Sequence, residues 1–169
     1  MSSTLKNNLQ KELSAPLTSF DWNVCHPNII CCSSIDTTCT IWDIHEEKLN
    51  KQVITHDKEV FDVSFSPDGN VFGSVGADCT ARLFDIRDLT RSDIIYDNSE
   101  PLLRLSFNLG RPNIIALTSL FSPVITLIDV RKPFTPAAKL TYHKKPVSNI
   151  AWSPYSMFTN KFHPLLDFG

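Results

Sequence analysis

The chain has 169 residues, 42% of them hydrophobic, so it is long enough to bury a core and suits one ordinary domain. Sixteen Lys and Arg against 18 Asp and Glu give a formal net charge of −2, which argues against a general attraction to nucleic acid or anionic lipid. The sequence contains no run of about 18 apolar residues, so no membrane-spanning helix is expected.

Residues 1–15 are polar, show no sustained period and predict a flexible lead-in without the apolar core of a secretory signal. The five cysteines are odd in number and form no C-x-x-C pair, which is typical of free thiols in a reducing compartment. Cys25 and His26 have no second pair at zinc-ligand spacing, which favours a small buried strand residue over a metal ligand. We therefore expect a cytoplasmic and nuclear protein with no metal and no cofactor.

From residue 16 onward, short alternating or β-branched runs bounded by turn residues predict strands. The turn Ser66-Pro67-Asp68-Gly69 is the clearest, because Pro fixes φ and Gly accepts a positive φ. The predicted strands lie at 16–22, 28–34, 38–42, 52–55, 60–65, 70–76, 80–84, 92–96, 101–107, 113–118, 124–128 and 137–141.

One motif returns along the chain: an acid in a turn, then a β-branched or aromatic run that closes on a second acid. The copies are Asp36 with Trp42-Asp43, Asp78 with Phe84-Asp85, and a weaker third with Ser122 in place of the turn acid and Ile128-Asp129 at its end. The closing acids are 42 and 44 residues apart. Aromatic residues that end the first strand of each repeat keep a similar spacing, at Trp22, Phe65, Phe107 and Trp152. A period in the low forties indicates the blades of a β-propeller.

The sequence thus predicts an all-β partial propeller of about three four-stranded antiparallel blades plus the first strand of a fourth. The repeats are predicted at 16–55, 56–98 and 99–142, the fourth starts over 143–154, and 155–169 is an aperiodic tail. Propellers close with roughly four to eight blades. The chain would then be a fragment or truncated product of a longer propeller, or an open sector completed by a partner chain.

Polar residues that recur with the repeat predict a hydrogen-bond network linking the start of each first strand to the turn acid. The network residues are Ser34, Asp36, Trp42, His56, Ser74 and Asp78. Catalysis would need a unique nucleophile in a cleft, whereas parts of this set recur as a folding device would. We therefore predict no catalytic residue, and expect the third repeat, with Ser122 at the acid position, to be the least rigid.

Six phrases resemble one group of WD-repeat proteins, which contains the plant transparent testa glabra proteins and the animal scaffold that binds dual-specificity kinases. They are APLTSFDW (Ala15–Trp22), SSIDTTCTIWD (Ser33–Asp43), THDKEVFD (Thr55–Asp62), SVGAD (Ser74–Asp78), IIY (Ile94–Tyr96) and PLLRL (Pro101–Leu105). The resemblance runs from about Ala15 to Pro154. It implies a seven-bladed propeller without enzymatic activity. It also implies protein partners: MYB and basic helix-loop-helix transcription factors, dual-specificity kinases, or a cullin-ligase adaptor.

This chain departs from the family by lacking its later blades, and its only WD dipeptide is Trp42-Asp43. Two segments are similar to the W-D-x-R box that docks WD-repeat receptors onto the cullin adaptor; their candidate residues are Asp85, Arg87, Asp129 and Arg131. Each arginine could pair with an acidic groove, or could simply solvate a strand end beside a local acid such as Asp88.

Loops between one repeat and the next predict a partner surface of mixed charge, made of Asp57, Lys58, Glu59, Arg104 and Lys144. Mixed charge favours protein over nucleic acid as the partner, although these loops could also be ordinary solvated turns. The leading hypothesis is a non-catalytic scaffold for transcription regulators or protein kinases. The alternatives are a substrate receptor or adaptor of a cullin-type ubiquitin ligase, and a truncated fragment without function.

Overall fold

The computed structural model describes residues 15–153, and every strand in that part of the chain belongs to one of three four-stranded antiparallel sheets. The first sheet holds β1 (Leu17–Trp22), β2 (Ile29–Ser34), β3 (Thr38–Asp43) and β4 (Lys48–Ile54). The second holds β5 (Val60–Phe65), β6 (Val71–Gly76), β7 (Thr80–Asp85) and β8 (Asp88–Asp97). The third holds β9 (Leu102–Phe107), β10 (Ile114–Ser119), β11 (Ile125–Asp129) and β12 (Pro136–Leu140).

Each sheet is built from hairpins, because every strand pairs with its neighbour in sequence. Turn chemistry explains why the chain reverses where it does: Gly69 has a φ of +70° and its amide donates to the carbonyl of Ser66 at 2.9 Å. The turns between second and third strands instead place Thr37 and Cys79 at positive φ. Because successive strands are antiparallel, the turns between β4 and β5 and between β8 and β9 share one rim with the turns between second and third strands. The other described turns share the opposite rim.

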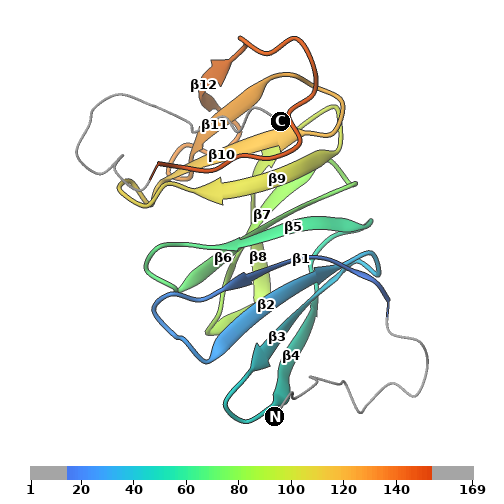
Figure 1. Ribbon diagram of the computed structural model, residues 1–169, viewed down its shortest axis with the longest axis vertical. Coiled ribbons are helices and arrows are strands. Elements are labelled where there is room, and N and C mark those ends of the chain that lie inside the picture. The colour runs from blue at the N-terminus through green and yellow to red at the C-terminus, as the bar shows by residue number, and fades with distance from the viewer. Residues whose placement is uncertain (1–14, 154–169) are drawn as a thin grey trace.

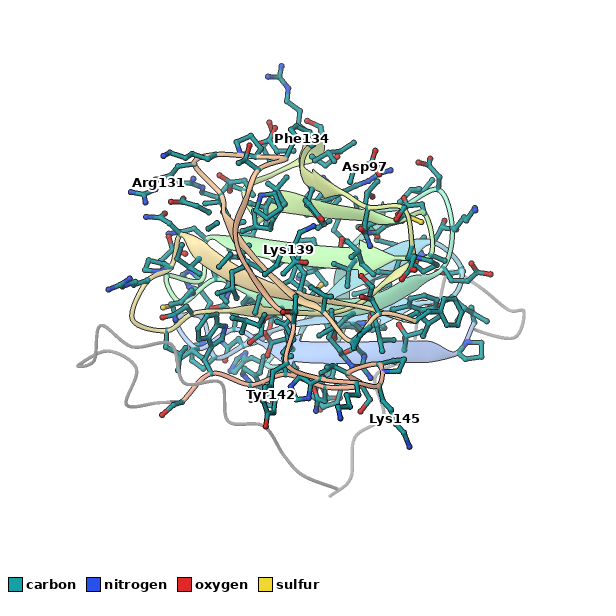
Figure 2. The ribbon with its side chains drawn as sticks, turned by 90° about the horizontal axis from the view of Figure 1, so that it is seen from above. Asp97, Arg131, Phe134, Lys139, Tyr142 and Lys145 are labelled. Carbon is teal, nitrogen blue, oxygen red and sulfur yellow. The ribbon has the colours of Figure 1, made fainter. Side chains whose placement is uncertain are left out.

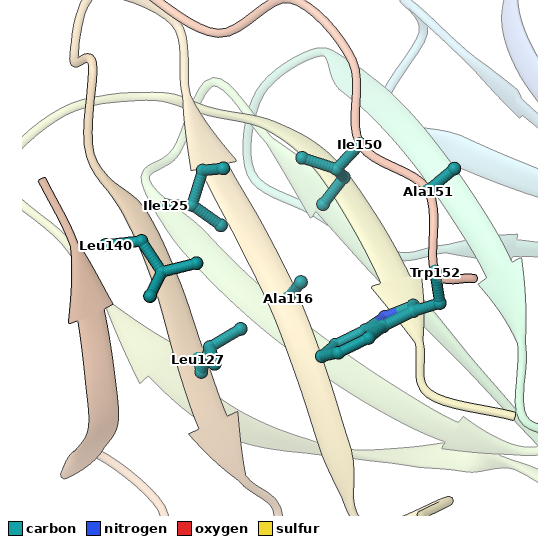
Figure 3. Close-up of a pocket in the computed structure, with 7 residues that line it drawn as sticks. All are labelled: Ala116, Ile125, Leu127, Leu140, Ile150, Ala151 and Trp152. Carbon is teal, nitrogen blue, oxygen red and sulfur yellow. The ribbon is translucent and has the colours of Figure 1, made fainter. Parts of the chain in front are cut away.

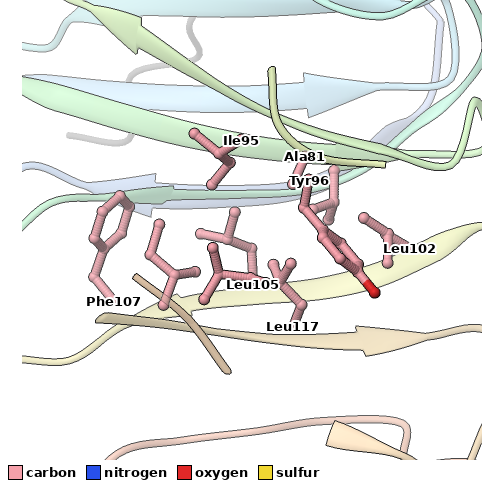
Figure 4. Close-up of a cluster of buried hydrophobic side chains, with 10 residues drawn as sticks. Ala81, Ile95, Tyr96, Leu102, Leu105, Phe107 and Leu117 are labelled. Atoms are coloured by element: carbon pink, nitrogen blue, oxygen red, sulfur yellow. The ribbon is translucent and has the colours of Figure 1, made fainter. Parts of the chain in front are cut away.

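The three sheets are stacked face to face along the long axis of the molecule, as Figure 1 shows. The first strand of each sheet lies against the sheet before it, with β5 on β1 and β2, and β9 on β5 and β6. Figure 4 shows the core between the second and third sheets, where Ile95, Leu105, Phe107 and Leu117 meet. Carboxylates also cross both junctions, since Asp21 accepts from the Phe65 amide at 2.7 Å and Asp62 from the Leu105 amide at 3.0 Å.

The predicted all-β partial propeller is confirmed by these three sheets. The start of the fourth repeat differs from a regular strand, because residues 141–150 have no strand pairing and Trp152 alone forms a bridge. This segment lies over the third sheet, where Val147, Ile150 and Trp152 pack against the cluster formed by Ala116, Ile125 and Leu127 (Figure 3). The Trp152 indole also donates to the carbonyl of Ser106 at 3.0 Å.

The predicted lead-in 1–15 and tail 155–169 fall outside the described residues, apart from residue 15. The outer strands β4 and β8 begin earlier than predicted, at Lys48 and Asp88, because tight turns join them directly to β3 and β7. Within residues 15–153 the structure contains no helix long and apolar enough to cross a bilayer.

Candidate functional site

A buried polar network ties the second sheet together where three chain segments meet. His56 lies just before β5, Ser74 lies in β6, and Asp78 lies in the turn between β6 and β7. The Nδ1 of His56 is 2.9 Å from the Asp78 Oδ1, and its Nε2 is 2.8 Å from the Ser74 Oγ. Because a carboxylate only accepts hydrogen bonds, Nδ1 carries the donated proton. The structure therefore brings together the three residues singled out in the second repeat.

The network extends beyond these three residues to the surface. Asp78 accepts from the Thr80 hydroxyl at 2.9 Å, from an Arg82 guanidinium nitrogen at 3.0 Å and from the Asp57 amide at 3.1 Å. The same Arg82 nitrogen donates to the Asp57 carboxylate at 2.7 Å. Burial alone would raise the pKa of Asp78, but the hydrogen bonds and charge of His56, with the backbone amides, outweigh burial and hold that pKa far below its usual value.

In outline the trio resembles a serine nucleophile, a histidine base and an orienting aspartate. Ser74 and His56, however, are 0% and 1% exposed, so a substrate has no path to the Ser74 hydroxyl. A nucleophile must reach the reacting atom of its substrate. The arrangement is therefore suited to holding the turn between β6 and β7 against the start of β5.

The first sheet does not assemble its three predicted residues into one chain. Asp36 accepts from the amide and hydroxyl of Thr38, at 3.1 and 2.6 Å. The Trp42 indole donates its single N–H to the Thr40 hydroxyl at 3.1 Å, and not to Asp36.

Strand register explains why Ser34 cannot take the part of Ser74. Ser34 lies opposite Leu17 and donates to the Pro16 carbonyl at 3.1 Å, with its own oxygen accepting from the Asp36 amide at 3.3 Å. By register, Cys32 occupies the position that corresponds to Ser74. The expectation that Ser34 substitutes within the same network is therefore wrong in this detail.

The third sheet replaces the network with weaker groups. Ser122 accepts from the Val124 amide at 3.2 Å, as the turn acids do from the corresponding threonine amides. Asn98, at the position of His56, donates to the Ser119 hydroxyl at 2.9 Å. Among the described residues the buried Thr118 hydroxyl has no hydrogen-bond partner. The lower rigidity of this sheet stays a prediction.

The predicted charged partner surface is only partly gathered in one place. Asp57, Lys58 and Glu59 are exposed in the turn between β4 and β5, and Lys144 is exposed in the turn after the third sheet. Arg104 instead lies on β9 against the second sheet. Its guanidinium donates to the Phe61 carbonyl at 3.3 Å and is 3.8 Å from the Asp62 carboxylate, so it helps to join two sheets.

On the opposite rim, two arginines make the same two-bond pair with the acid two residues before them. Arg87 Nε and Nη2 donate to Asp85 at 2.9 and 2.6 Å, and Arg131 donates to Asp129 at the same distances. The hydrogen bonds from the arginines lower the pKa of both carboxyls to about 2. The partner of Arg87 is thus Asp85 and not Asp88. In Figure 2, Arg131 and Lys145 lie toward opposite sides of the molecule.

Sequence reasoning missed Thr80 and Arg82 as members of the network. Thr80 had a signal, because Thr stands at the second position after the turn acid in both full repeats. Arg82 had none, because Thr40 stands at the same offset in the first repeat. It also missed Asn23, a fully buried side chain that donates to the Gly69 carbonyl at 2.8 Å and so joins two sheets. Within residues 15–153, no three His, Cys, Asp or Glu side chains are grouped to hold a metal ion.

Comparison with known proteins matches the family model "WD domain, G-beta repeat" to residues 5–43 and 47–85. A "DDB1- and CUL4-associated factor 7 homolog" of Dictyostelium discoideum is 47% identical over 90% of this chain and 48% of that protein. An uncharacterized WD repeat-containing protein of Schizosaccharomyces pombe is 42% identical over 90% of this chain and 40% of its own length. A WD repeat-containing protein of Saccharomyces cerevisiae is 39% identical over 82% of this chain and 31% of its own length.

The chain therefore spans less than half the length of these relatives. The second matched segment begins beside β4 and ends with β7, which agrees with the stacked four-stranded sheets. The comparison thus identifies two WD40-type repeats in this chain, over residues 5–43 and 47–85, and the three four-stranded sheets agree with a partial WD-repeat propeller.

Proposed function

We propose that this chain is part of a non-catalytic scaffold that assembles other proteins. The observation that carries the proposal is that one set of polar residues is buried and bonded within the second sheet, while another set is charged and exposed on a rim. The potentially reactive residues Ser74, His56 and Asp78 bond one another inside the sheet, whereas the charged side chains of Lys58 and Glu59 are exposed on a rim turn. A rigid sheet that presents exposed loops of mixed charge is a common basis for protein recognition.

The proposed partners are transcription regulators of the MYB and basic helix-loop-helix types, or dual-specificity protein kinases, in the cytoplasm and nucleus. This choice is supported by the resemblance carried by such phrases as Ser33–Asp43 and Thr55–Asp62. The 47% identity to the Dictyostelium relative, whose name associates it with other proteins, adds support for protein partners in general.

The test is a charge exchange on the rim that leaves the network intact. Lys58→Glu with Glu59→Lys changes the exposed turn, while Asp57 stays in place because it pairs with Arg82. We expect loss of binding to a purified MYB-type, helix-loop-helix-type or kinase partner in calorimetry. Lys139→Glu, on the exposed side of β12, is the matched control and should bind normally. Unchanged binding by the folded double variant to every partner that the wild type binds would contradict the proposal.

A second candidate is docking to a cullin-ligase adaptor through the rim that carries Arg87 and Arg131. The specific observation is that each guanidinium is already oriented by two bonds to Asp85 or Asp129 and remains exposed. Those bonds use two of the five N–H donors of an arginine, which leaves donors for an acidic partner. The name of the Dictyostelium relative, which associates that protein with DDB1 and CUL4, favours this candidate.

Arg87→Ala with Arg131→Ala should abolish binding to purified DDB1 and leave binding of a regulator at the other rim intact. Arg91→Ala, an exposed arginine on β8, is the matched control. Equal DDB1 binding by the double variant and the control would contradict adaptor docking and would leave the proposed scaffold function unaffected.

A further inference from the structure

Thr135 lies in the turn between β11 and β12 and is followed directly by Pro136. Residues 131–135 are all exposed, and among the described residues the Thr135 side chain has no hydrogen-bond partner. Figure 2 shows Arg131 and Phe134, from the same turn, at the periphery of the molecule. The residue before a proline is biased toward an extended backbone. Thr135 therefore offers an exposed, unbonded hydroxyl on an extended segment, which is what a protein kinase needs in an acceptor.

The structure distinguishes Thr135 from the other hydroxyl residues that precede a proline. Two Ser-Pro pairs lie wholly within residues 15–153, at Ser66 and Ser122. Ser66 is 8% exposed, and its hydroxyl bonds the Val71 carbonyl at 2.9 Å. Ser122 is half-buried and its oxygen accepts from the Val124 amide at 3.2 Å. Of these three acceptors before a proline, only Thr135 is exposed and unbonded in the described part of the chain.

The exposure of this turn does not come from the position of the third sheet at one end of the stack. The second sheet has a sheet on each face, and its corresponding turn, between β7 and β8, still leaves the Arg87 side chain 73% exposed. In addition, the Phe134 amide donates to the Ile95 carbonyl of β8 at 2.8 Å, which holds the turn toward the second sheet. A further sheet stacked on the third would therefore leave Thr135 accessible.

The chain around Thr135 can also leave the sheet at low cost. Pro136 has no amide hydrogen to donate to β11, and the pairing of β11 with β12 shifts register between Leu127 and Ile128. β12 is an edge strand of five residues. The segment can thus enter a kinase cleft through a local opening, while the rest of the sheet stays folded.

Positive charge surrounds the acceptor. Arg131 and Lys132 lie four and three positions before Thr135, and both are exposed. From residue 130 to residue 145 the chain has five Lys or Arg and no Asp or Glu. Charge patterns of this kind contribute to the choice of substrate by a kinase. Proline after the acceptor suits an enzyme that offers no hydrogen-bond partner for an amide at that position.

We propose that Thr135 is phosphorylated by a proline-directed protein kinase that favours basic residues before the acceptor. The Thr135 oxygen attacks the γ-phosphorus of Mg²⁺-bound ATP, the bond from that phosphorus to the β,γ-bridging oxygen breaks, and ADP leaves. An aspartate of the kinase accepts the hydroxyl proton. The product brings about −1.5 to −2 of charge into the basic stretch 130–145. This goes beyond the scaffold function and does not depend on which partner either rim binds.

The test is incubation of the complete 169-residue chain with Mg²⁺-ATP and two purified proline-directed kinases, one mitogen-activated and one cyclin-dependent, followed by mass spectrometry. A synthetic peptide of residues 128–141 tests recognition without the fold. We expect phosphate on Thr135 of the folded chain, with kcat/KM within about tenfold of the peptide value because the turn opens locally. Thr135→Ala should abolish phosphate incorporation. Ser122→Ala is the matched control and should leave incorporation unchanged.

Two further variants test the assigned specificity. Arg131→Ala with Lys132→Ala should lower kcat/KM by about threefold to tenfold, and Lys139→Ala, behind the acceptor, should not. In the peptide, where folding plays no part, Pro136→Ala should abolish phosphorylation; equal rates would overturn the proline-directed assignment. Phosphorylation of the peptide but not of the folded chain would overturn the proposal, because the turn would then be closed to the enzyme. Failure of both kinases on both substrates would overturn it too, as would incorporation that survives Thr135→Ala.

Discussion

Removing the Asp78 carboxylate should be among the most destabilising single changes in the chain. That carboxylate accepts from His56, Thr80, Arg82 and the Asp57 amide, and the His56 ring is buried. Removing one partner of a buried pair costs about 3–5 kcal/mol, because the other is left without compensation. We expect Asp78→Ala to lose about that much of a total stability of roughly 5–15 kcal/mol.

Asp36→Ala is the matched control, since Asp36 is the corresponding turn acid of the first sheet. Asp36 is exposed, and within residues 15–153 its side chain accepts only from Thr38, so its loss should cost about 1 kcal/mol. Urea unfolding followed by circular dichroism gives both free energies, with equal m-values as the sign that only stability has changed. An Asp78→Ala loss no larger than that of Asp36→Ala would refute the reasoning.

The pH dependence of the free energy of unfolding is an independent test of the role of Asp78. Its folded pKa lies below its unfolded value of about 3.9, so the folded state binds fewer protons in acid and the wild type gains stability as pH rises. That contribution is complete above about pH 4 to 5 and is lost as pH falls toward the folded pKa. Asp78→Ala should therefore show a shallower loss of stability in acid than the wild type.

Two substitutions test the junctions between sheets, and one labelling experiment tests the buried residues Ser74, His56 and Asp78. Asp62→Asn should stabilise the protein slightly at pH 7, because burial raises the pKa of Asp62 while an amide oxygen can still accept from Leu105; the gain in melting temperature should vanish in acid, where the carboxyl is neutral in both states. Gly69→Ala should destabilise by about 1–3 kcal/mol in urea unfolding, because φ is +70° and a Cβ would lie 2.5 Å from the Asn23 Oδ1. A fluorophosphonate probe should not label the native chain at Ser74, and labelling there detected by mass spectrometry would contradict the non-catalytic proposal.

The strands and the stacking order could be predicted because both depend on local patterns that repeat. Turn residues such as Gly69 and the recurring aromatic positions mark them directly in the sequence. Side-chain partners depend on register, which spacing alone leaves open by one or two residues. Spacing from the turn acid already places Cys32 at the position of Ser74, but it could not exclude that Ser34 takes over the role, which the pairing of Ser34 with Leu17 rules out. The contacts of Arg104 with Phe61 and Asp62 depend on how the third sheet stacks on the second, and the strand pattern alone does not predict that stacking.

The second matched sequence segment, residues 47–85, is out of phase with the sheets by one strand, since it begins just before β4 of the first sheet and ends with β7, the third strand of the second sheet. This segment therefore spans the junction between the first and second sheets. An excised sequence repeat would carry β4 away from β3 while leaving β8 behind, so it would expose two unpaired edges. Recombination between relatives should accordingly be tolerated best at the turns between sheets, such as 98–101, where no pairing within a sheet is cut.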